Sequence, residues 1–208
     1  NNLNIINKSD DKDTIDSKKI RNSIILEHNQ RNMINEGLSS ASGDDIVIIS
    51  DIDEIPILNE VDFEKNKNKL IYFKQKMFYY KFNLLYQNFD WIGSKACRKS
   101  FFKSPQWLRD TKNKQYPFWR FDTYFNKRKY NNVHLVENGG WHFTQIKSSE
   151  DIFSKLSTFA HHVDFKESGL GLDDISKAVK EKKILYDHSA DKTKQNNKWV
   201  AKNSLTSI

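Results

Sequence analysis

The stretch DDIVIISDIDEIP, residues 44–56, decides how the rest of the chain is interpreted. Its run of four β-branched residues, Ile46-Val47-Ile48-Ile49, is flanked by loop-forming residues, which is typical of a strand buried on both faces. Strands of this kind occur mostly in parallel sheets, so we predict a central strand of a mostly parallel sheet, stopped by Pro56. An acidic triplet, Asp51-Ile52-Asp53, follows the run directly.

Strands and helices are expected to alternate around this stretch. Apolar residues recur at three- and four-residue steps between residues 20 and 38, which predicts an amphipathic helix capped by Asp16 or Ser17. Further strands are expected at 69–82, 91–98 and 133–136, and further helices at 107–109, 148–163 and 175–179. The sum is one α/β domain over residues 17–187, with a flexible lead-in (1–16) and a polar tail (188–208).

Composition limits the classes of protein to consider. The 208 residues are 37% hydrophobic, with 13% aromatic, which is enough for a core and excludes a disordered chain. No apolar run approaches the roughly 20 residues that span a bilayer. The single cysteine, Cys97, excludes an intrachain disulfide and is expected to be buried. The net charge of +7 is spread along the chain, so we expect a solvated lysine-rich surface and no nucleic-acid partner.

The acidic triplet is the feature that carries chemistry. Strand alternation places Asp51 and Asp53 on one side and Ile52 on the other. The carboxyl edge of a parallel sheet is where α/β folds bind ligands, and two carboxylates there suit Mg²⁺ or Mn²⁺ bridging to substrate phosphates. An Asp-rich turn that binds only its own backbone explains the triplet equally well.

Three functions fit a strand followed by this triplet. In a haloacid-dehalogenase-like phosphatase, Asp51 would be the nucleophile and Asp53 the general acid and base. However, Ile55 stands where that motif has Thr or Val, and the downstream pair Asp173-Asp174 is typical of a helix start. In a nucleotide-sugar glycosyltransferase, the two carboxylates hold a metal ion on the donor diphosphate. The third hypothesis is a non-catalytic remnant of an enzyme that binds glycan or nucleic acid.

Residues 44–56 closely resemble a segment of glycosyltransferase family 17, the family of the transferase that adds the bisecting N-acetylglucosamine to N-glycans. Further segments that resemble this family, in the same order along the chain, are Gln30-Arg31-Asn32, Gly37-Leu38, Gly140-Trp141-His142-Phe143, residues 152–157 and residues 173–186. The resemblance covers residues 27–187. Several separated motifs in one order are more specific than a single acidic triplet.

The resemblance implies a GT-A-type, Rossmann-like fold, a UDP-sugar donor, a Mn²⁺ or Mg²⁺ ion, and inverting transfer to a glycan hydroxyl. The sugar in characterised members is N-acetylglucosamine. Asp53 would ligate the metal, Asp51 would contact it through water or bind the donor ribose, and His142 would contact the metal or the diphosphate. GT-A domains begin with strands that hold the uracil base, whereas only 50 residues precede Asp51. We therefore expect either a fragment that lacks the N-terminal half of the donor site or a reduced member of the family.

An inverting transfer also needs a general base near the acceptor hydroxyl. Glu137 and Asp122 are the candidate bases, and Glu137 ranks first because it adjoins the Gly-Trp-His segment. Taken alone, each is better explained as an ordinary surface carboxylate, with Asp122 paired to Arg120 or Arg128.

Further candidate donor contacts are Arg31, Trp141 and His161. Arg31 lies on the helix before the acidic strand, and His161 is placed at a helix end where it could reach a phosphate. Trp141 would stack on a sugar or, as we favour, fill the core. A UDP-sugar and a glycan are therefore the expected partners of a soluble chain without a transmembrane segment. A cytoplasmic location is favoured, with any N-terminal targeting or anchor segment lost.

Overall fold

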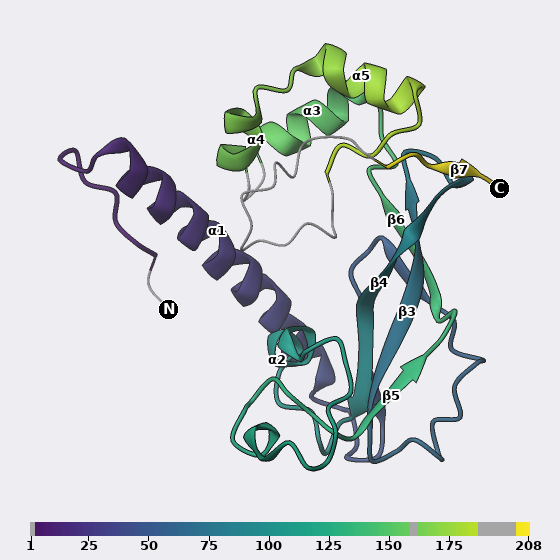
Figure 1. The fold of residues 1–208 in the computed structure, drawn as a ribbon. Coiled ribbons are helices and arrows are strands. Elements are labelled where there is room, and N and C mark those ends of the chain that lie inside the picture. Colours follow the sequence, from purple (N-terminus) through teal and green to yellow (C-terminus); the bar gives the residue numbers. More distant parts are fainter. Residues whose placement is uncertain (1–2, 159–161, 187–202) are drawn as a thin grey trace. The chain divides into compact units, whose positions relative to one another are not determined.

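The computed structural model describes residues 3–158, 162–186 and 203–208 and divides the chain into two compact units (Figure 1). One unit holds residues 31–78 and 85–144, and the other holds residues 1–30, 79–84 and 145–208. The helices are α1 (Lys12–Met33), α2 (Pro105–Asp110), α3 (Ser149–Thr158), α4 (His162–Ser168) and α5 (Leu172–Lys180), with the 3₁₀ turns η1 (Ile34–Leu38) and η2 (Phe121–Thr123). The strands are β1 (Ile46–Ile49), β2 (Glu54–Pro56), β3 (Leu70–Tyr79), β4 (Leu84–Arg98), β5 (Val133–Val136), β6 (Gly140–Thr144) and β7 (Thr206–Ser207).

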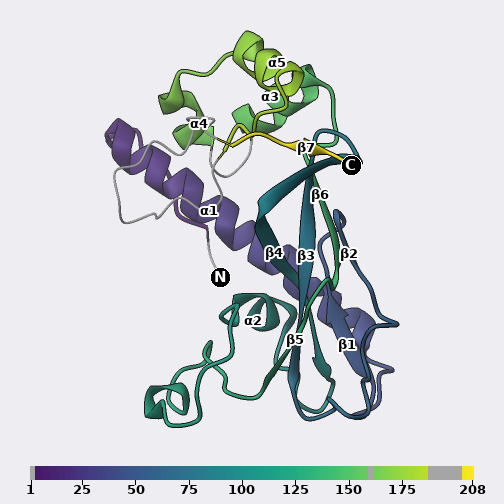
Figure 2. The ribbon, with the colours of Figure 1, turned by 45° about the vertical axis from the view of Figure 1, so that its right-hand side comes forward.

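The sheet of the 31–144 unit is built around the long antiparallel pair β3 and β4 (Figures 1 and 2). The strand order is β1-β4-β3-β6-β2, and β5 runs parallel to the first half of β3. The pairs β1–β4, β3–β4 and β2–β6 are all antiparallel. The α/β class expected from the sequence is therefore confirmed, with a mixed sheet.

The expectation of a central strand in a mostly parallel sheet is wrong for β1. Within the described residues, β1 lies at one edge of the strand order and pairs antiparallel with β4. Its continuous apolar run has another cause, because both of its faces are covered. Val47 and Ile49 belong to one core cluster, while Ile46 and Ile48 pack against a second cluster on the opposite face.

The cluster on the Val47 side joins the sheet to α2 through buried Leu70, Tyr72 and Leu108. The expected helical turn at 107–109 is confirmed as part of α2, whose N-cap Ser104 accepts a hydrogen bond from the Trp107 amide at 3.1 Å. Cys97 is buried in the same cluster, as expected.

The helix before β1 starts earlier than the predicted cap at Asp16 or Ser17. Helix α1 starts at Lys12, where Asp11 Oδ1 accepts a hydrogen bond from the Thr14 amide at 2.7 Å, so neither Asp16 nor Ser17 is its cap. Between residues 3 and 45, the structure contains α1 and η1 and no strand. No helix within the described ranges is long and apolar enough to cross a membrane.

The other unit contains most of α1, the helices α3, α4 and α5, the short strand β7 and the tip of the β3–β4 hairpin. Its buried apolar residues include Ile152, Phe165 and Ile175, one from each of α3, α4 and α5. At the end of the expected polar tail, Leu205 is buried and the amide of Ile208 donates to the Asn83 carbonyl at 3.0 Å. Residues 187–202 lie outside the described residues.

Lys95 is a buried cation in the core of the 31–144 unit. Its Nζ donates to the carbonyls of Arg109 at 2.9 Å and Thr111 at 2.5 Å, and it lies 4.9 Å from the centre of the Tyr72 ring. Burial, followed by the nearby charge of Arg109, lowers the pKa of Lys95 to about 7.

We expect the free energy of unfolding to rise with pH between about 7 and 8.5, by up to roughly 1 kcal/mol per pH unit. In this range Lys95 is protonated in the unfolded chain but has lost its proton in the folded chain. Urea unfolding across this range should show the slope in the wild type and lose it in Lys95→Met. The control Lys76→Met removes an exposed lysine and should keep the slope. Burial raises the pKa of the Cys97 thiol to about 12, so at higher pH this thiol makes the free energy of unfolding fall as pH rises. The pH range therefore ends at about 8.5. An unchanged slope in Lys95→Met would contradict this assignment.

Candidate functional site

The acidic triplet lies in a tight turn between β1 and β2, and not on a strand. The amide of Glu54 donates to the Asp51 carbonyl at 3.0 Å, and the amide of Asp51 donates to Glu54 Oε2, also at 3.0 Å. Ile52 is fully exposed, whereas the side chains of Asp51 and Asp53 are 40% and 37% exposed. The turn therefore presents two accessible carboxylates, and Pro56 ends β2 and not the strand that precedes them.

Glu54 is the buried member of this acidic turn, with a side chain that is 1% exposed. Its carboxylate accepts hydrogen bonds from Trp91 Nε1 at 2.7 Å and Ser94 Oγ at 3.4 Å, besides the Asp51 amide. Gly93 leaves room for it, since a Cβ atom at that position would lie 1.8 Å from Glu54 Oε1. A buried carboxylate of this kind is stable only when its charge is compensated.

Arg109 provides that compensation from the last turn of α2. Its guanidinium donates to both carboxylate oxygens of Glu54, at 2.8 and 3.1 Å, and to Asp51 Oδ2 at 2.7 Å. It also donates to the Gly93 carbonyl. One arginine thus links the acidic turn, β4 and α2.

Arg31 approaches the other oxygen of Asp51. Its Nη2 lies 3.5 Å from Asp51 Oδ1, and its Nη1 donates to Gln106 Oε1 at 2.5 Å. Asn32 fixes the same segment, because its Oδ1 accepts a hydrogen bond from the Gln106 amide at 3.1 Å. Arg31, which the sequence offered as a candidate donor contact, therefore lies beside the acidic triplet, and Asp51 lies between two guanidinium groups.

His142 lies beside Asp53. The antiparallel pairing of β2 with β6 places Glu54 opposite His142, and the amide of Phe143 donates to the Asp53 carbonyl at 2.8 Å. His142 Nε2 is 3.6 Å from Asp53 Oδ2, and its ring stacks on Trp91 with centroids 4.9 Å apart. The Nδ1 atom of His142 is buried without a hydrogen-bond partner among the described residues.

The neighbouring Trp141 differs from the expected core residue. It is 39% exposed and pairs with Ile55, on the face of β6 opposite to His142. Gly140, with a φ of +136°, brings this strand so close to β2 that a Cβ atom would lie 2.1 Å from the Ile55 carbonyl oxygen. His161, the other candidate donor contact, lies outside the described residues.

The two candidate bases are engaged elsewhere. Glu137 pairs with Lys74 at 3.0 Å, and Asp122 pairs with Arg120 and Lys129, each at 2.7 Å. The hydrogen bonds from these two cations hold the pKa of Asp122 well below its usual range, which makes it a weak base. Within the described residues, neither carboxylate forms an ion pair with a residue of the 51–54 turn.

Two side chains at the turn offer the kinds of donor atom that a Mg²⁺ or Mn²⁺ ion takes. The described residues contain no group of three or more His, Cys, Asp and Glu side chains arranged to hold a metal. Asp53 and His142 do face one another with a carboxylate oxygen and a ring nitrogen, whereas Asp51 is occupied by Arg109. Mg²⁺ is often held by one or two carboxylates together with substrate phosphates, so Asp53 and His142 would be its protein ligands here.

The sequence did not indicate the residues that hold the turn together. Glu54 follows the acidic triplet directly and, in the sequence, is indistinguishable from an ordinary acidic loop residue. Trp91 and Arg109 lie far along the chain in segments without a motif. The inward direction of Glu54 follows from β2, which begins at this residue and which was not predicted from the sequence.

Comparison with known protein families, with curated proteins and with solved structures finds no match for this chain. The functional argument therefore rests on the residues around the acidic turn.

We expect Glu54→Gln to lower the free energy of unfolding by about 3 kcal/mol, because it leaves the buried guanidinium of Arg109 with half of its compensation. The matched control Glu60→Gln changes an exposed carboxylate and should stay within about 0.5 kcal/mol of the wild type. Urea unfolding followed by tryptophan fluorescence measures both.

A double-mutant cycle that combines Glu54→Gln with Arg109→Gln measures the interaction energy between these two residues. The fall in the free energy of unfolding of the double variant should be at least about 1 kcal/mol smaller than the sum of the falls of the two single variants. The reason is that the second substitution no longer leaves a buried charge without its partner. Strictly additive losses would show that Glu54 and Arg109 do not stabilise one another.

Proposed function

We propose that this chain is a metal-dependent inverting glycosyltransferase. It would move a sugar, N-acetylglucosamine in the first instance, from a UDP-sugar donor to a hydroxyl of a glycan. The acidic turn would be the donor-diphosphate end of its site, in a GT-A-type domain. The proposal combines the resemblance of the sequence with the arrangement of residues around the turn.

The observation that carries the proposal is the approach of His142 to Asp53. The two residues come from segments far apart in the chain, which the resemblance to family 17 assigns to one site. A surface Asp-rich turn that serves only its own backbone gives no reason for a histidine with a buried, unpartnered ring nitrogen beside it.

The chain's own residues would then share the work as follows. Asp53 and His142 would hold the metal ion, and the chemistry that such an ion supplies is charge stabilisation of a leaving nucleoside diphosphate. Arg31, whose guanidinium lies beside Asp51, would bind a phosphate oxygen or orient the donor through Asp51. Glu54 and Arg109 would keep the turn in place from within the protein.

Two features favour transfer over phosphatase-type hydrolysis at Asp51. Its carboxylate lies between Arg109 and Arg31, and two cations make a carboxylate a poorer nucleophile. The acidic pair that a phosphatase would need downstream has another role, because Asp174 accepts a hydrogen bond from the Gly171 amide at 2.8 Å and caps α5.

Calorimetry with UDP-N-acetylglucosamine, with and without Mn²⁺, tests the donor site. We expect binding that needs Mn²⁺ and that weakens at least tenfold in Asp53→Asn and in His142→Ala, since each removes one ligand of the ion. Asp44→Asn, which changes an exposed carboxylate at the other end of β1, should bind like the wild type. Metal-independent binding, or no binding by the wild type, would contradict the proposal.

The general base is tested separately, on turnover. Glu137→Gln should keep UDP-sugar binding and lose at least about a hundredfold in kcat if Glu137 accepts the acceptor proton. Asp122→Asn serves as the comparison, because its ion pairs make it the weaker base. A loss with Asp122→Asn and none with Glu137→Gln would reverse the ranking of the two carboxylates.

A further inference from the structure

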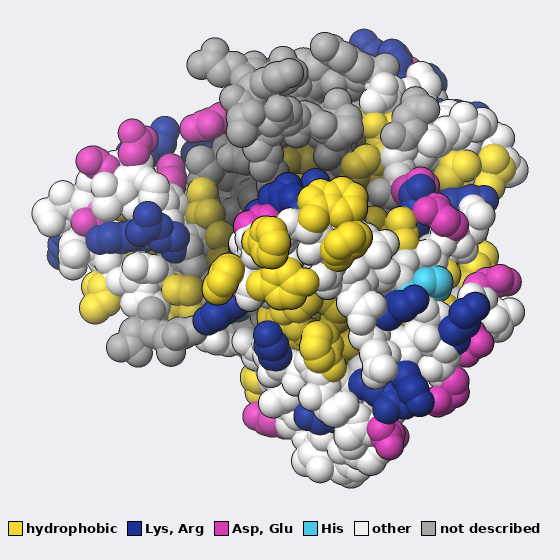
Figure 3. All heavy atoms as spheres, turned by 60° about the horizontal axis from the view of Figure 1, so that its bottom comes forward, with side chains coloured by type: hydrophobic (Ala, Val, Ile, Leu, Met, Phe, Trp, Pro, Cys, Tyr) yellow, Lys and Arg dark blue, Asp and Glu magenta, His cyan; other side chains and the backbone are white. Residues whose placement is uncertain are grey.

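The segment between α2 and β5 carries an unusual density of exposed rings. Five aromatic side chains within eight residues are at least 64% exposed: Phe118 (73%), Trp119 (64%), Phe121 (76%), Tyr124 (66%) and Phe125 (92%). Figure 3, which turns the lower end of Figure 1 toward the reader, shows hydrophobic side chains gathered in one group with Lys and Arg side chains beside them. Phenylalanine has no polar tip, so this exposure is costly in water and marks an interaction surface.

The expectation of an evenly spread charge is wrong for this segment, which holds most of the chain's net charge. Residues 112–132 contain six basic side chains and one acidic side chain, Asp122, which gives five of the seven net positive charges of the whole protein. The basic residues are Lys112, Lys114, Arg120, Lys127, Arg128 and Lys129. We call residues 112–132 the aromatic–basic loop.

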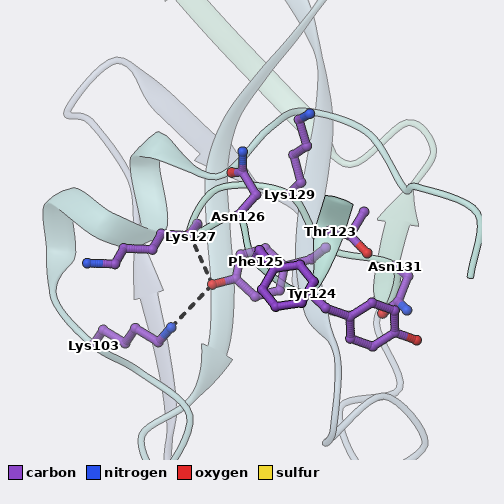
Figure 4. A pocket seen from close by; sticks show the side chains of 9 residues that line it. Lys103, Thr123, Tyr124, Phe125, Asn126, Lys127, Lys129 and Asn131 are labelled. Atoms are coloured by element: carbon purple, nitrogen blue, oxygen red, sulfur yellow. Dashed lines mark hydrogen bonds between the residues drawn. The ribbon is translucent and has the colours of Figure 1, made fainter. Parts of the chain in front are cut away.

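Rings and cations meet in a pocket of this loop of about 440 Å³ (Figure 4). Lys103, Lys127 and Lys129 line it together with Tyr124 and Phe125. Lys103 Nζ lies 3.4 Å from the hydroxyl of Tyr130, as the dashed line in Figure 4 marks. Ammonium groups are therefore within reach of an anionic group that approaches between the exposed rings.

We propose that the aromatic–basic loop docks on a membrane surface that contains anionic lipids. Aromatic residues partition into the interface between headgroups and acyl chains, and neighbouring Lys and Arg side chains pair with lipid phosphates and carboxylates. The loop supplies both sets of groups on one surface. This inference does not depend on the proposed transferase activity.

The arrangement of the rings favours a lipid surface over a flat ligand. Phe118 and Trp119 pack edge to face, with centroids 5.2 Å apart and planes at 81°. Two such rings offer no common flat platform for successive nucleobases or sugar rings, which stack on aromatic faces. Insertion among acyl chains needs no common plane, and a neutral glycan gives no reason for the excess of positive charge.

Co-sedimentation with vesicles tests the proposal. The wild type should bind vesicles of phosphatidylcholine with 30% phosphatidylserine at least tenfold more tightly than vesicles of phosphatidylcholine alone, and 0.5 M NaCl should weaken the binding. Phe121→Ser combined with Phe125→Ser should weaken it at least tenfold. The matched control is Phe82→Ser, which changes an exposed phenylalanine (69%) outside the loop.

Charge variants and fluorescence complete the test. Lys127→Gln with Arg128→Gln should weaken binding by about fivefold per charge, whereas Lys8→Gln with Lys12→Gln should have little effect. A blue shift of tryptophan emission on vesicle binding should disappear in Trp119→Phe while binding persists. Circular dichroism of each variant checks that the fold is retained.

Two results would overturn the proposal. One is equal binding to anionic vesicles by the wild type and the Phe121→Ser/Phe125→Ser variant, or no binding by either. The other is the absence of vesicle binding together with tight binding of a 12-nucleotide uridine RNA that the same variants abolish, which would assign the loop to single-stranded nucleic acid. Failure of UDP-sugar binding leaves these results unaffected.

Discussion

The burial of the Glu54 carboxylate is the constraint on which the arrangement of the 31–144 unit depends. An ionised carboxylate that is removed from water must be compensated by charge and hydrogen bonds, and the partners must come from the surrounding elements. Trp91 from β4 and Arg109 from α2 meet that need. The acidic turn, the β4 strand and the α2 helix are therefore held by one group, and displacement of any of them would leave a buried charge unpaired.

The same group explains two local features of the sequence. Gly93 is needed in the middle of β4 because any side chain there would occupy the space of the Glu54 carboxylate. Ser94 lies fully buried beside it and exchanges a hydrogen bond with Ser50 at 2.7 Å. Small and hydroxylated residues surround the carboxylate in place of apolar core residues, because its oxygens require room and donors.

Features that depend on near neighbours in the chain could be predicted from the sequence. The apolar run of β1, the helical turn at α2 and the burial of Cys97 follow from local pattern and composition, and the structure confirms them. The position of β1 in the sheet could not be predicted in this way. A strand that is apolar on both faces is expected to be covered on both faces, but helices or loops can cover an edge strand as completely as a central one. The apolar run therefore does not indicate where the strand lies in the sheet.

The site shows the same division. The resemblance implied a metal or diphosphate contact for His142, and Arg31 was a candidate donor contact, but no local pattern would have indicated that both lie beside the acidic triplet. Arg109 and Trp91 remained unrecognised because their role depends on where α2 and β4 pass the turn, which is a property of the fold. A buried charge pair leaves no trace in the sequence until its two members are known to be neighbours.

The two aspartates of the triplet consequently have different electrostatic surroundings. Asp51 lies between two guanidinium groups, whereas Asp53 faces an imidazole. Three carboxylates in the turn against two arginines leave one negative charge when the imidazole is neutral. A nucleoside diphosphate would be repelled by that charge, and a divalent cation bound at Asp53 would reverse its sign. In the proposed transferase, the negative charge of the turn would therefore make donor binding depend on the metal ion.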